Sequence, residues 1–185
     1  MIICAGKNET FPFAQTVGVG LIESAINLTK ICIEKSPKSI LFIGSAGSYG
    51  KYKVFDIVES KSASNIELSY LEDYSYTPIE NRVISDTILT KSEIIVNSSN
   101  YISINENLSK KFLQDNILLE NMEFFSVLSV ANKFNIPAFG VFIITNYANK
   151  RAHSDFLINH KEAMQKLIKY LQEKDLIKKE QIGKI

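Results

Sequence analysis

Residues 137–144 read PAFGVFII, a continuous apolar run that predicts a fully buried strand. Other β-branched and apolar runs predict strands at residues 2–4, 14–19, 39–43, 54–60, 92–97 and 117–119. Helical spacing predicts helices over 21–35, after an Asn105 cap, over 123–134 and after a Ser154 cap. Because strands and helices alternate, we expect an α/β fold in which helices cover both faces of one sheet.

The balance of charges limits the classes of partner that the chain can bind. Its 185 residues carry 21 Lys+Arg against 20 Asp+Glu, a formal net charge of +1. This balance predicts no nucleic-acid-binding surface. No apolar run approaches the roughly 20 residues of a membrane span. The N-terminus lacks the features of a signal peptide, so we expect a cytoplasmic protein that does not bind membranes.

No internal repeat, linker or low-complexity stretch divides the sequence. We therefore expect one domain over residues 1–185, with the Lys-rich stretch 178–185 as a frayed tail. Cys4 and Cys32 show no CxxC spacing, and no set of His, Cys and carboxylate residues has the spacing of metal ligands. The sequence therefore predicts no metal site.

Ligands in α/β folds gather at the carboxyl ends of the strands, so the residues that follow each predicted strand are candidate site residues. Strand 39–43 runs into Gly44-Ser45-Ala46-Gly47-Ser48, where small residues let backbone N–H groups approach a ligand closely. Ser45 adds a hydroxyl group. The segment therefore fits an anion or sugar cradle, although a plain tight turn explains it equally well.

Three other strand ends carry aromatic or polar side chains. Tyr101 follows strand 92–97 and can stack on a flat heterocycle, although such a Tyr is more often surface packing. Glu123 opens helix 123–134, where the helix dipole favours an ionised carboxylate that can accept bonds from two sugar hydroxyls, or simply a cap. Asn146 follows strand 137–144, where its amide can bind a purine edge or serve as a turn residue.

The order and spacing of these segments are more specific than any one of them. The GSAG segment at 44–47 followed by VFDIV at 54–58, the stretch IVNSSNYI at 95–102 and the Met122-Glu123 pair resemble motifs of the nucleoside phosphorylase and nucleosidase superfamily. Intervals of 22 residues from Tyr101 to Glu123 and of 23 from Glu123 to Asn146 fit the same family. The resemblance covers residues 14–171 and implies a three-layer fold with a mixed, partly barrel-like central sheet flanked by helices.

The resemblance also implies cleavage of the N-glycosidic bond of a purine nucleoside, with no metal or organic cofactor. It implies two catalytic residues, Glu9, in the position of a water-activating glutamate, and Asn146, on the purine edge. The substrate-binding residues that it implies are Ser45, Ala46, Gly47, Tyr101, Ile102, Met122 and Glu123. Among these, Glu123 binds the ribose hydroxyls, Tyr101 stacks on the base, and Ser45 with its neighbouring amides holds the nucleophile.

Two positions depart from the nucleosidase pattern. Nucleosidases have an aspartate general acid where this chain has Asn146, and an amide cannot deliver a proton. An ITN sequence like that at 144–146 occurs in trimeric purine nucleoside phosphorylases, so the resemblance favours inosine- or guanosine-like substrates. Nucleosidases also have an arginine where this chain has Phe142, so Lys7, Arg82, Arg151 or a neighbouring subunit would have to supply a cation.

We therefore expect phosphorolysis of a purine nucleoside to free base and ribose 1-phosphate, with inorganic phosphate as co-substrate, by a homo-oligomer (dimer or trimer). A hydrolytic nucleosidase of the methylthioadenosine/S-adenosylhomocysteine type is the alternative within the same class. A hypothesis from a different class is a non-catalytic nucleoside- or partner-binding member of the fold, because the aspartate and the arginine are missing.

Overall fold

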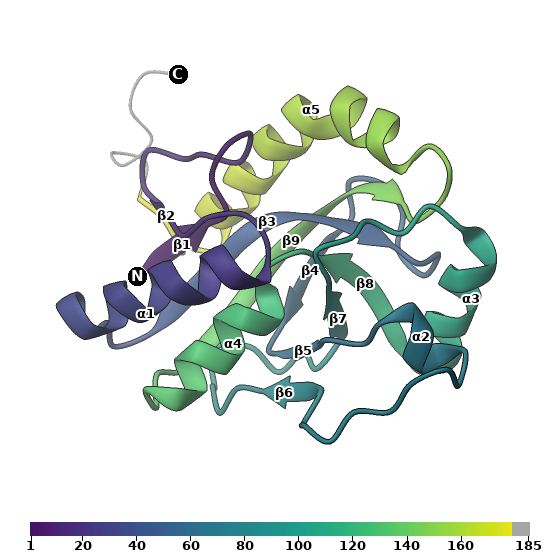
Figure 1. Ribbon diagram of the computed structural model, residues 1–185. Coiled ribbons are helices and arrows are strands. Elements are labelled where there is room, and N and C mark those ends of the chain that lie inside the picture. The colour runs from purple at the N-terminus through teal and green to yellow at the C-terminus, as the bar shows by residue number, and fades with distance from the viewer. Residues whose placement is uncertain (179–185) are drawn as a thin grey trace.

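A computed structural model describes residues 1–178, and these contain nine strands and five helices (Figure 1). The strands are β1 (Ile2–Cys4), β2 (Gln15–Thr16), β3 (Ile40–Ser48), β4 (Ile57–Ser60), β5 (Ser62–Ser64), β6 (Arg82–Ile84), β7 (Ile95–Ser98), β8 (Ile117–Asn121) and β9 (Ala138–Tyr147). The helices are α1 (Leu21–Lys35), α2 (Leu68–Leu71), α3 (Glu106–Gln114), α4 (Phe124–Lys133) and α5 (Ala152–Glu173). The tail predicted at 178–185 lies, apart from Lys178, outside the described residues.

All nine strands belong to one mixed sheet with β3 and β9 at its centre. β9 runs parallel to β3 along the whole of one edge, from Ile40 to Ser48. The opposite edge of β3 is shared: β1 pairs with it in parallel near its start, and β8 pairs with it in antiparallel at Gly47 and Ser48. The same edge of β3 therefore pairs with β1 at its start and with β8 at its end, and the sheet curls around the end of β3. The expected three-layer α/β fold with a mixed sheet is confirmed.

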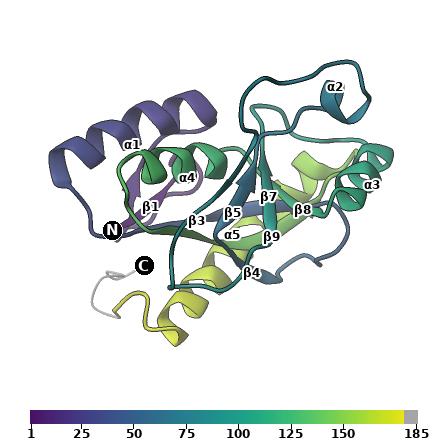
Figure 2. The same ribbon diagram turned by 90° about the horizontal axis from the view of Figure 1, so that it is seen from below.

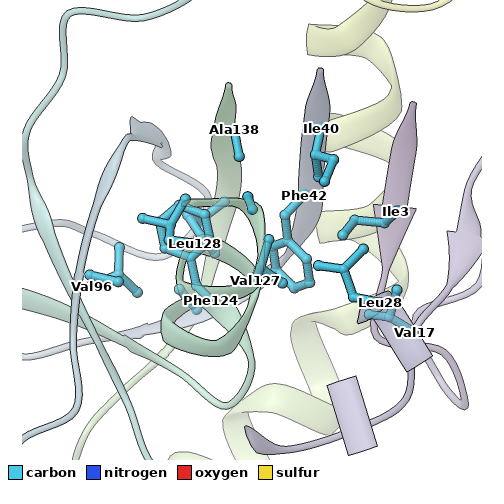
Figure 3. Packing of buried hydrophobic residues seen from close by; sticks show 14 of the residues in the cluster. Ile3, Val17, Leu28, Ile40, Phe42, Val96, Phe124, Val127, Leu128 and Ala138 are labelled. Atoms are coloured by element: carbon cyan, nitrogen blue, oxygen red, sulfur yellow. The ribbon is translucent and has the colours of Figure 1, made fainter. Parts of the chain in front are cut away.

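Helices cover both faces of the sheet (Figures 1 and 2). α1 and α4 pack against each other and over a core cluster that includes Leu28, Phe42 and Phe124 (Figure 3). α5 lies on the other face, where it buries Ala163 and Leu167, among others, against β9 and β3. No helix in the described part of the chain is both long enough and apolar enough to cross a membrane.

Phe142 of β9 lies at the centre of an aromatic cluster. Its ring centroid is 4.9 Å from that of Phe124 and 5.8 Å from that of Phe42, and the residue is fully buried. Phe142→Ala is expected to lower the free energy of unfolding by about 3–5 kcal/mol, because the cavity that it leaves is enclosed by rigid strands. Urea denaturation measures this, with the exposed Tyr74→Ala as control. A loss below about 1 kcal/mol in Phe142→Ala would contradict this packing.

Two segments for which a turn was one of two alternatives belong to strands. β3 continues through Gly44 to Ser48, so the alternative of a plain tight turn there is wrong. The backbone stays extended because it remains hydrogen-bonded to β9 throughout and to β8 at its end. β9 likewise extends to Tyr147, so Asn146 lies within the strand and not in a turn after it.

Other predicted boundaries also differ from the structure. Residues 54–56 form a turn, closed by a 2.7 Å hydrogen bond from Lys53 N to Asp56 Oδ2, because Phe55 has a φ of 73° that no strand accommodates. α5 begins at Ala152, so the Ser154 cap is wrong; the Ser154 hydroxyl donates to Arg151 O at 2.9 Å. The Asn105 cap is confirmed, since its Oδ1 accepts from Asn107 N at 2.9 Å.

Candidate active site

A cavity of about 270 Å³ lies where β1, β3, β7, β8 and β9 end. It gathers side chains from distant parts of the chain. The parallel strands β1, β3 and β9 bring their carboxyl ends to the same edge of the sheet, and β8, which is antiparallel to β3, ends beside Gly47. All nine residues predicted for the site line it: Glu9, Ser45, Ala46, Gly47, Tyr101, Ile102, Met122, Glu123 and Asn146. Their individual roles remain predictions.

Glu9 is held over the end of β3 by a four-residue turn. Gly6 N donates to Glu9 O at 3.2 Å and Glu9 N donates to Gly6 O at 3.0 Å. The Glu9 carboxylate accepts hydrogen bonds from the backbone N–H of Ser45, at 3.2 Å to each oxygen, and from the Ser45 hydroxyl. Gly44 makes this approach possible, because a Cβ there would lie only 2.7 Å from Glu9 Oε2. The small residues of the segment therefore accommodate a carboxylate of the protein itself.

Burial governs the protonation of Glu9. The residue is 8% exposed, and desolvation raises the pKa of its carboxyl group, although the Ser45 hydrogen bonds and the nearby His160 lower it. A carboxylate with a raised pKa is a stronger base than an exposed glutamate.

Glu123 lies immediately before α4 and is 3% exposed. Its Oε1 accepts a hydrogen bond from Gly20 N at 2.9 Å, which ties the start of α1 to the start of α4. Burial raises the pKa of Glu123 to about 7, and the Glu9 carboxylate adds to this, whereas the Gly20 hydrogen bond opposes it. Desolvation therefore outweighs the stabilising effect of the helix start, and near neutral pH the Glu123 carboxyl group exchanges between its neutral and ionised forms.

Asparagine side chains fix the two helices around Glu123. Asn121 Nδ2 donates to Ser45 O at 3.1 Å, and its Oδ1 accepts from Glu123 N and Phe124 N, so the first turn of α4 is anchored to β3. Asn100 Oδ1 accepts from Leu21 N at 2.9 Å and caps α1 in the same way. These contacts position Glu123 between the two helix starts.

Asn146 lies at the far end of β9 and is 6% exposed. Its Oδ1 accepts from Thr145 Oγ1 at 2.9 Å, and its Nδ2 donates to Tyr147 O at 3.2 Å. On the other side of β3, Glu120 of β8 is paired with Gly47, and β9 pairs Asn146 with the same Gly47. Glu120 also lines the cavity, so a carboxyl group and an amide flank one glycine.

The family model of the phosphorylase superfamily matches residues 3–173. The chain belongs to this superfamily. A search of curated protein sequences found no match. Among solved structures, the chain is similar to the 5′-methylthioadenosine/S-adenosylhomocysteine nucleosidase of Helicobacter pylori, with a TM-score of 0.81 and 16% identity over 93% of this chain and 95% of that one. A structure of the H. pylori enzyme holds 5′-methylthioadenosine in its active site.

Two further structures show the same fold. Futalosine hydrolase of H. pylori gives a TM-score of 0.80 at 17% identity, over 92% of this chain and 94% of that one. The Streptococcus pneumoniae methylthioadenosine/S-adenosylhomocysteine nucleosidase gives 0.72 at 15% identity, over 92% and 95%. The superfamily suggests that this chain cleaves the glycosidic bond of a nucleoside, and the similar structures are hydrolytic nucleosidases.

In this phosphorylase-superfamily chain, the two residues predicted beside the base lie at the mouth of the cavity. The Tyr101 side chain is 85% exposed and that of Ile102 is 50% exposed, although both line the cavity. Met122 is half-buried against the cavity wall. An exposed aromatic ring can move over a bound heterocycle and stack on it. Stacking of Tyr101 on the base therefore stays a prediction.

The cations that were considered as substitutes for a missing arginine lie in different places. Lys7 lines the cavity, and it is the only Lys or Arg among the described residues that does so. Arg82 pairs with Asp115 at 3.9 Å, and Arg151 pairs with Asp155 at 3.4 Å. Phe142, which stands where nucleosidases have an arginine, is buried in the core, so it supplies no charge to the cavity.

Several cavity residues were not predicted from the sequence, namely Glu120, Asn121, Ser99 and Phe156 among others. For Glu120 a signal was present, because a carboxylate interrupts the apolar run Ile117-Leu118-Leu119 before the strand ends. Within residues 1–178, no three His, Cys, Asp or Glu side chains are grouped closely enough to hold a metal ion.

Proposed function

We propose that this protein hydrolyses the N-glycosidic bond of a purine nucleoside, with Glu9 as the base that activates water and Glu123 as the ligand of the ribose hydroxyls. One observation favours hydrolysis over phosphorolysis: both donors of Ser45, its N–H and its hydroxyl, already bind the Glu9 carboxylate. The donors that a phosphate would need are therefore used by a carboxylate of the protein.

Charge in the cavity supports the same choice. Three carboxyl groups line it, Glu9, Glu120 and Glu123, against the single amine of Lys7 among the described residues. The Glu9 carboxylate, in the ionised form that acts as a base, repels a phosphate dianion. The planar bidentate clamp that an arginine provides is absent from this cavity within residues 1–178. Water is neutral and is not repelled.

The chemistry follows from the arrangement. As the bond between ribose and purine breaks, positive charge develops on the sugar, and a carboxylate near the ring stabilises it. Glu9 takes a proton from water as the oxygen attacks the anomeric carbon. Gly20 N donates to Glu123 Oε1 and holds the carboxyl group at the cavity wall, where its oxygens can accept hydrogen bonds from the ribose diol.

The experiment is an assay of base release from inosine, guanosine and 5′-methylthioadenosine, each with and without phosphate. We expect free base and free sugar at a rate that does not depend on phosphate. Strict dependence on phosphate, with ribose 1-phosphate as product, would instead support phosphorolysis. Preference for inosine and guanosine would support the role proposed for Asn146 at a 6-oxopurine edge.

The non-catalytic alternative is favoured by one feature, the amide of Asn146, which cannot deliver a proton to the leaving base. Isothermal titration calorimetry separates it from the enzyme. Nucleoside binding with no base release under any condition would support a binding protein, and rapid turnover would exclude that alternative.

We also propose that the protein forms a homodimer through the apolar surface beside the cavity mouth. Ile22 and Ile26 of α1 are 69% and 52% exposed, and Tyr101, Ile102 and Ile104 follow the residue whose side chain caps α1. Exposed apolar side chains that gather in this way are typical of an interface. Light scattering should give twice the monomer mass of 20.9 kDa, and Ile22→Asp with Ile26→Asp should reduce it to the monomer.

A further inference from the structure

Glu120 and Asn146 converge on one point of the cavity wall. A Cβ at Gly47 would lie 3.1 Å from Glu120 Oε1 and 3.1 Å from Asn146 Nδ2. β8 and β9 flank β3 at this residue, and each contributes one of the two groups. The absence of a side chain at Gly47 lets the carboxyl group and the amide approach the same space.

The Glu120 carboxyl group is held by hydrogen-bond donors and not by a cationic side chain of the described residues. Its Oε2 accepts a hydrogen bond from the hydroxyl of the buried Tyr49 at 3.1 Å, and both oxygens lie 3.3 Å from Ser103 N. No lysine, arginine or histidine of the described residues forms an ion pair with it that closes below 4.0 Å. Burial raises the pKa of this carboxyl group, so it retains its proton closer to neutral pH than an exposed glutamate does.

The other two carboxyl groups of the cavity are placed differently. Glu9 binds Ser45 and approaches Gly44, earlier along β3, and Glu123 binds Gly20 at the start of α1. Glu120 shares its end of the cavity with Asn146, the residue assigned to the purine. The leaving purine needs a proton there, because its nitrogen takes the electron pair of the broken bond.

We propose that Glu120 is the general acid that protonates the departing purine, while Asn146 holds the base in position. The proposal rests on the proposed hydrolysis. The bond between the anomeric carbon and the purine nitrogen breaks, its electron pair stays on the purine, and the Glu120 proton moves to a purine nitrogen. Water adds to the anomeric carbon and gives its proton to Glu9. The sum is addition of one water molecule, and solvent then returns a proton from Glu9 to Glu120.

The test compares two leaving groups in Glu120→Gln, which preserves the size of the side chain and an acceptor for Tyr49. Purine nucleosides need a proton donor, whereas 4-nitrophenyl riboside releases a stable phenolate without one. We expect kcat for the purine nucleoside to fall about 100-fold and kcat for the nitrophenyl riboside to change less than about 3-fold. Glu67→Gln, at an exposed glutamate, serves as the matched control and should leave both rates unchanged.

The rates of Glu120→Gln with the two substrates distinguish a proton donor from a structural residue. An equal loss with both substrates would make Glu120 a structural residue, and no loss with either would exclude it from the reaction; both overturn the proposal. Wild-type protein that cleaves neither substrate would overturn the proposed hydrolysis itself, and the inference with it. If Glu120→Gln does not fold, Glu120→Asp provides the same comparison, with an expected loss of about 10-fold for the purine nucleoside alone.

Discussion

Glu123→Gln is expected to reduce nucleoside cleavage by about 10³-fold and, at the same time, to make the protein more stable above neutral pH. The loss of activity follows because a neutral amide cannot stabilise the positive charge that develops on the sugar, and it binds the diol less well than a carboxylate. Kinetics at pH 8 measure this loss, which should appear mainly in kcat.

The gain in stability follows from the direction of the pKa shift. The pKa of Glu123 is about 7 in the folded protein and 4.5 when the group is unperturbed, so the folded state binds its proton more tightly. The contribution of this group to stability is therefore fully present below about pH 4.5 and is lost as the pH rises through about 7. Glutamine carries no charge at any pH, so it avoids a loss of about 2–3 kcal/mol at pH 8.

Urea denaturation at pH 4.5 and pH 8 measures the effect. The variant and the wild type should have similar free energies of unfolding at the lower pH and differ at the higher one. The exposed Glu67→Gln should change stability by less than about 0.5 kcal/mol at both. A variant that is less stable than the wild type at pH 8 would mean that the ionised Glu123 carboxylate stabilises the fold, which contradicts the destabilisation expected from its burial.

Glu9→Gln is expected to reduce hydrolysis by about 10³-fold, because the variant cannot take a proton from the attacking water. Its amide oxygen still accepts from Ser45 N, so the turn at residues 6–9 and nucleoside binding should be preserved. Steady-state kinetics should therefore show a fall in kcat with little change in KM.

Small anions distinguish loss of the base from loss of the fold. Removal of the Glu9 charge lowers the repulsion of anionic nucleophiles, so azide should restore part of the base release and give ribosyl azide. Ser45→Ala, which removes only one donor to Glu9, should cost about 10-fold in kcat. Full activity of Glu9→Gln in water alone would exclude Glu9 as the base.

The sequence was sufficient for the location of the site but not for its internal contacts. Tyr101, Glu123 and Asn146 each follow or end a strand, and this made them candidates, but the resemblance to the superfamily was needed to predict that they share one cavity. Glu9 meets Ser45 because the turn at residues 6–9 folds back over β3, and this depends on a tertiary approach that has no local signature.

The same limit explains the errors. Gly44–Ser48 has the composition of a turn, but two neighbouring strands hold it extended, and its glycines admit Glu9 and Glu120 instead of bending the chain. For Glu123, the helix dipole is visible in the sequence, whereas the burial that raises its pKa comes from tertiary packing, which brings Gly20, 103 residues earlier, into hydrogen-bond contact with the carboxyl group. Packing from distant segments decided both cases.

A crystal structure of Glu9→Gln with a bound purine nucleoside tests the central claim most directly. We predict one nucleoside in the cavity, with both ribose hydroxyls on Glu123, the base between Tyr101 and the Glu120–Asn146 pair, and a water molecule between residue 9 and the anomeric carbon. A nucleoside bound elsewhere, or one whose ribose faces Asn146 and whose base faces Glu9, would contradict the proposed hydrolysis and the residue roles assigned to it.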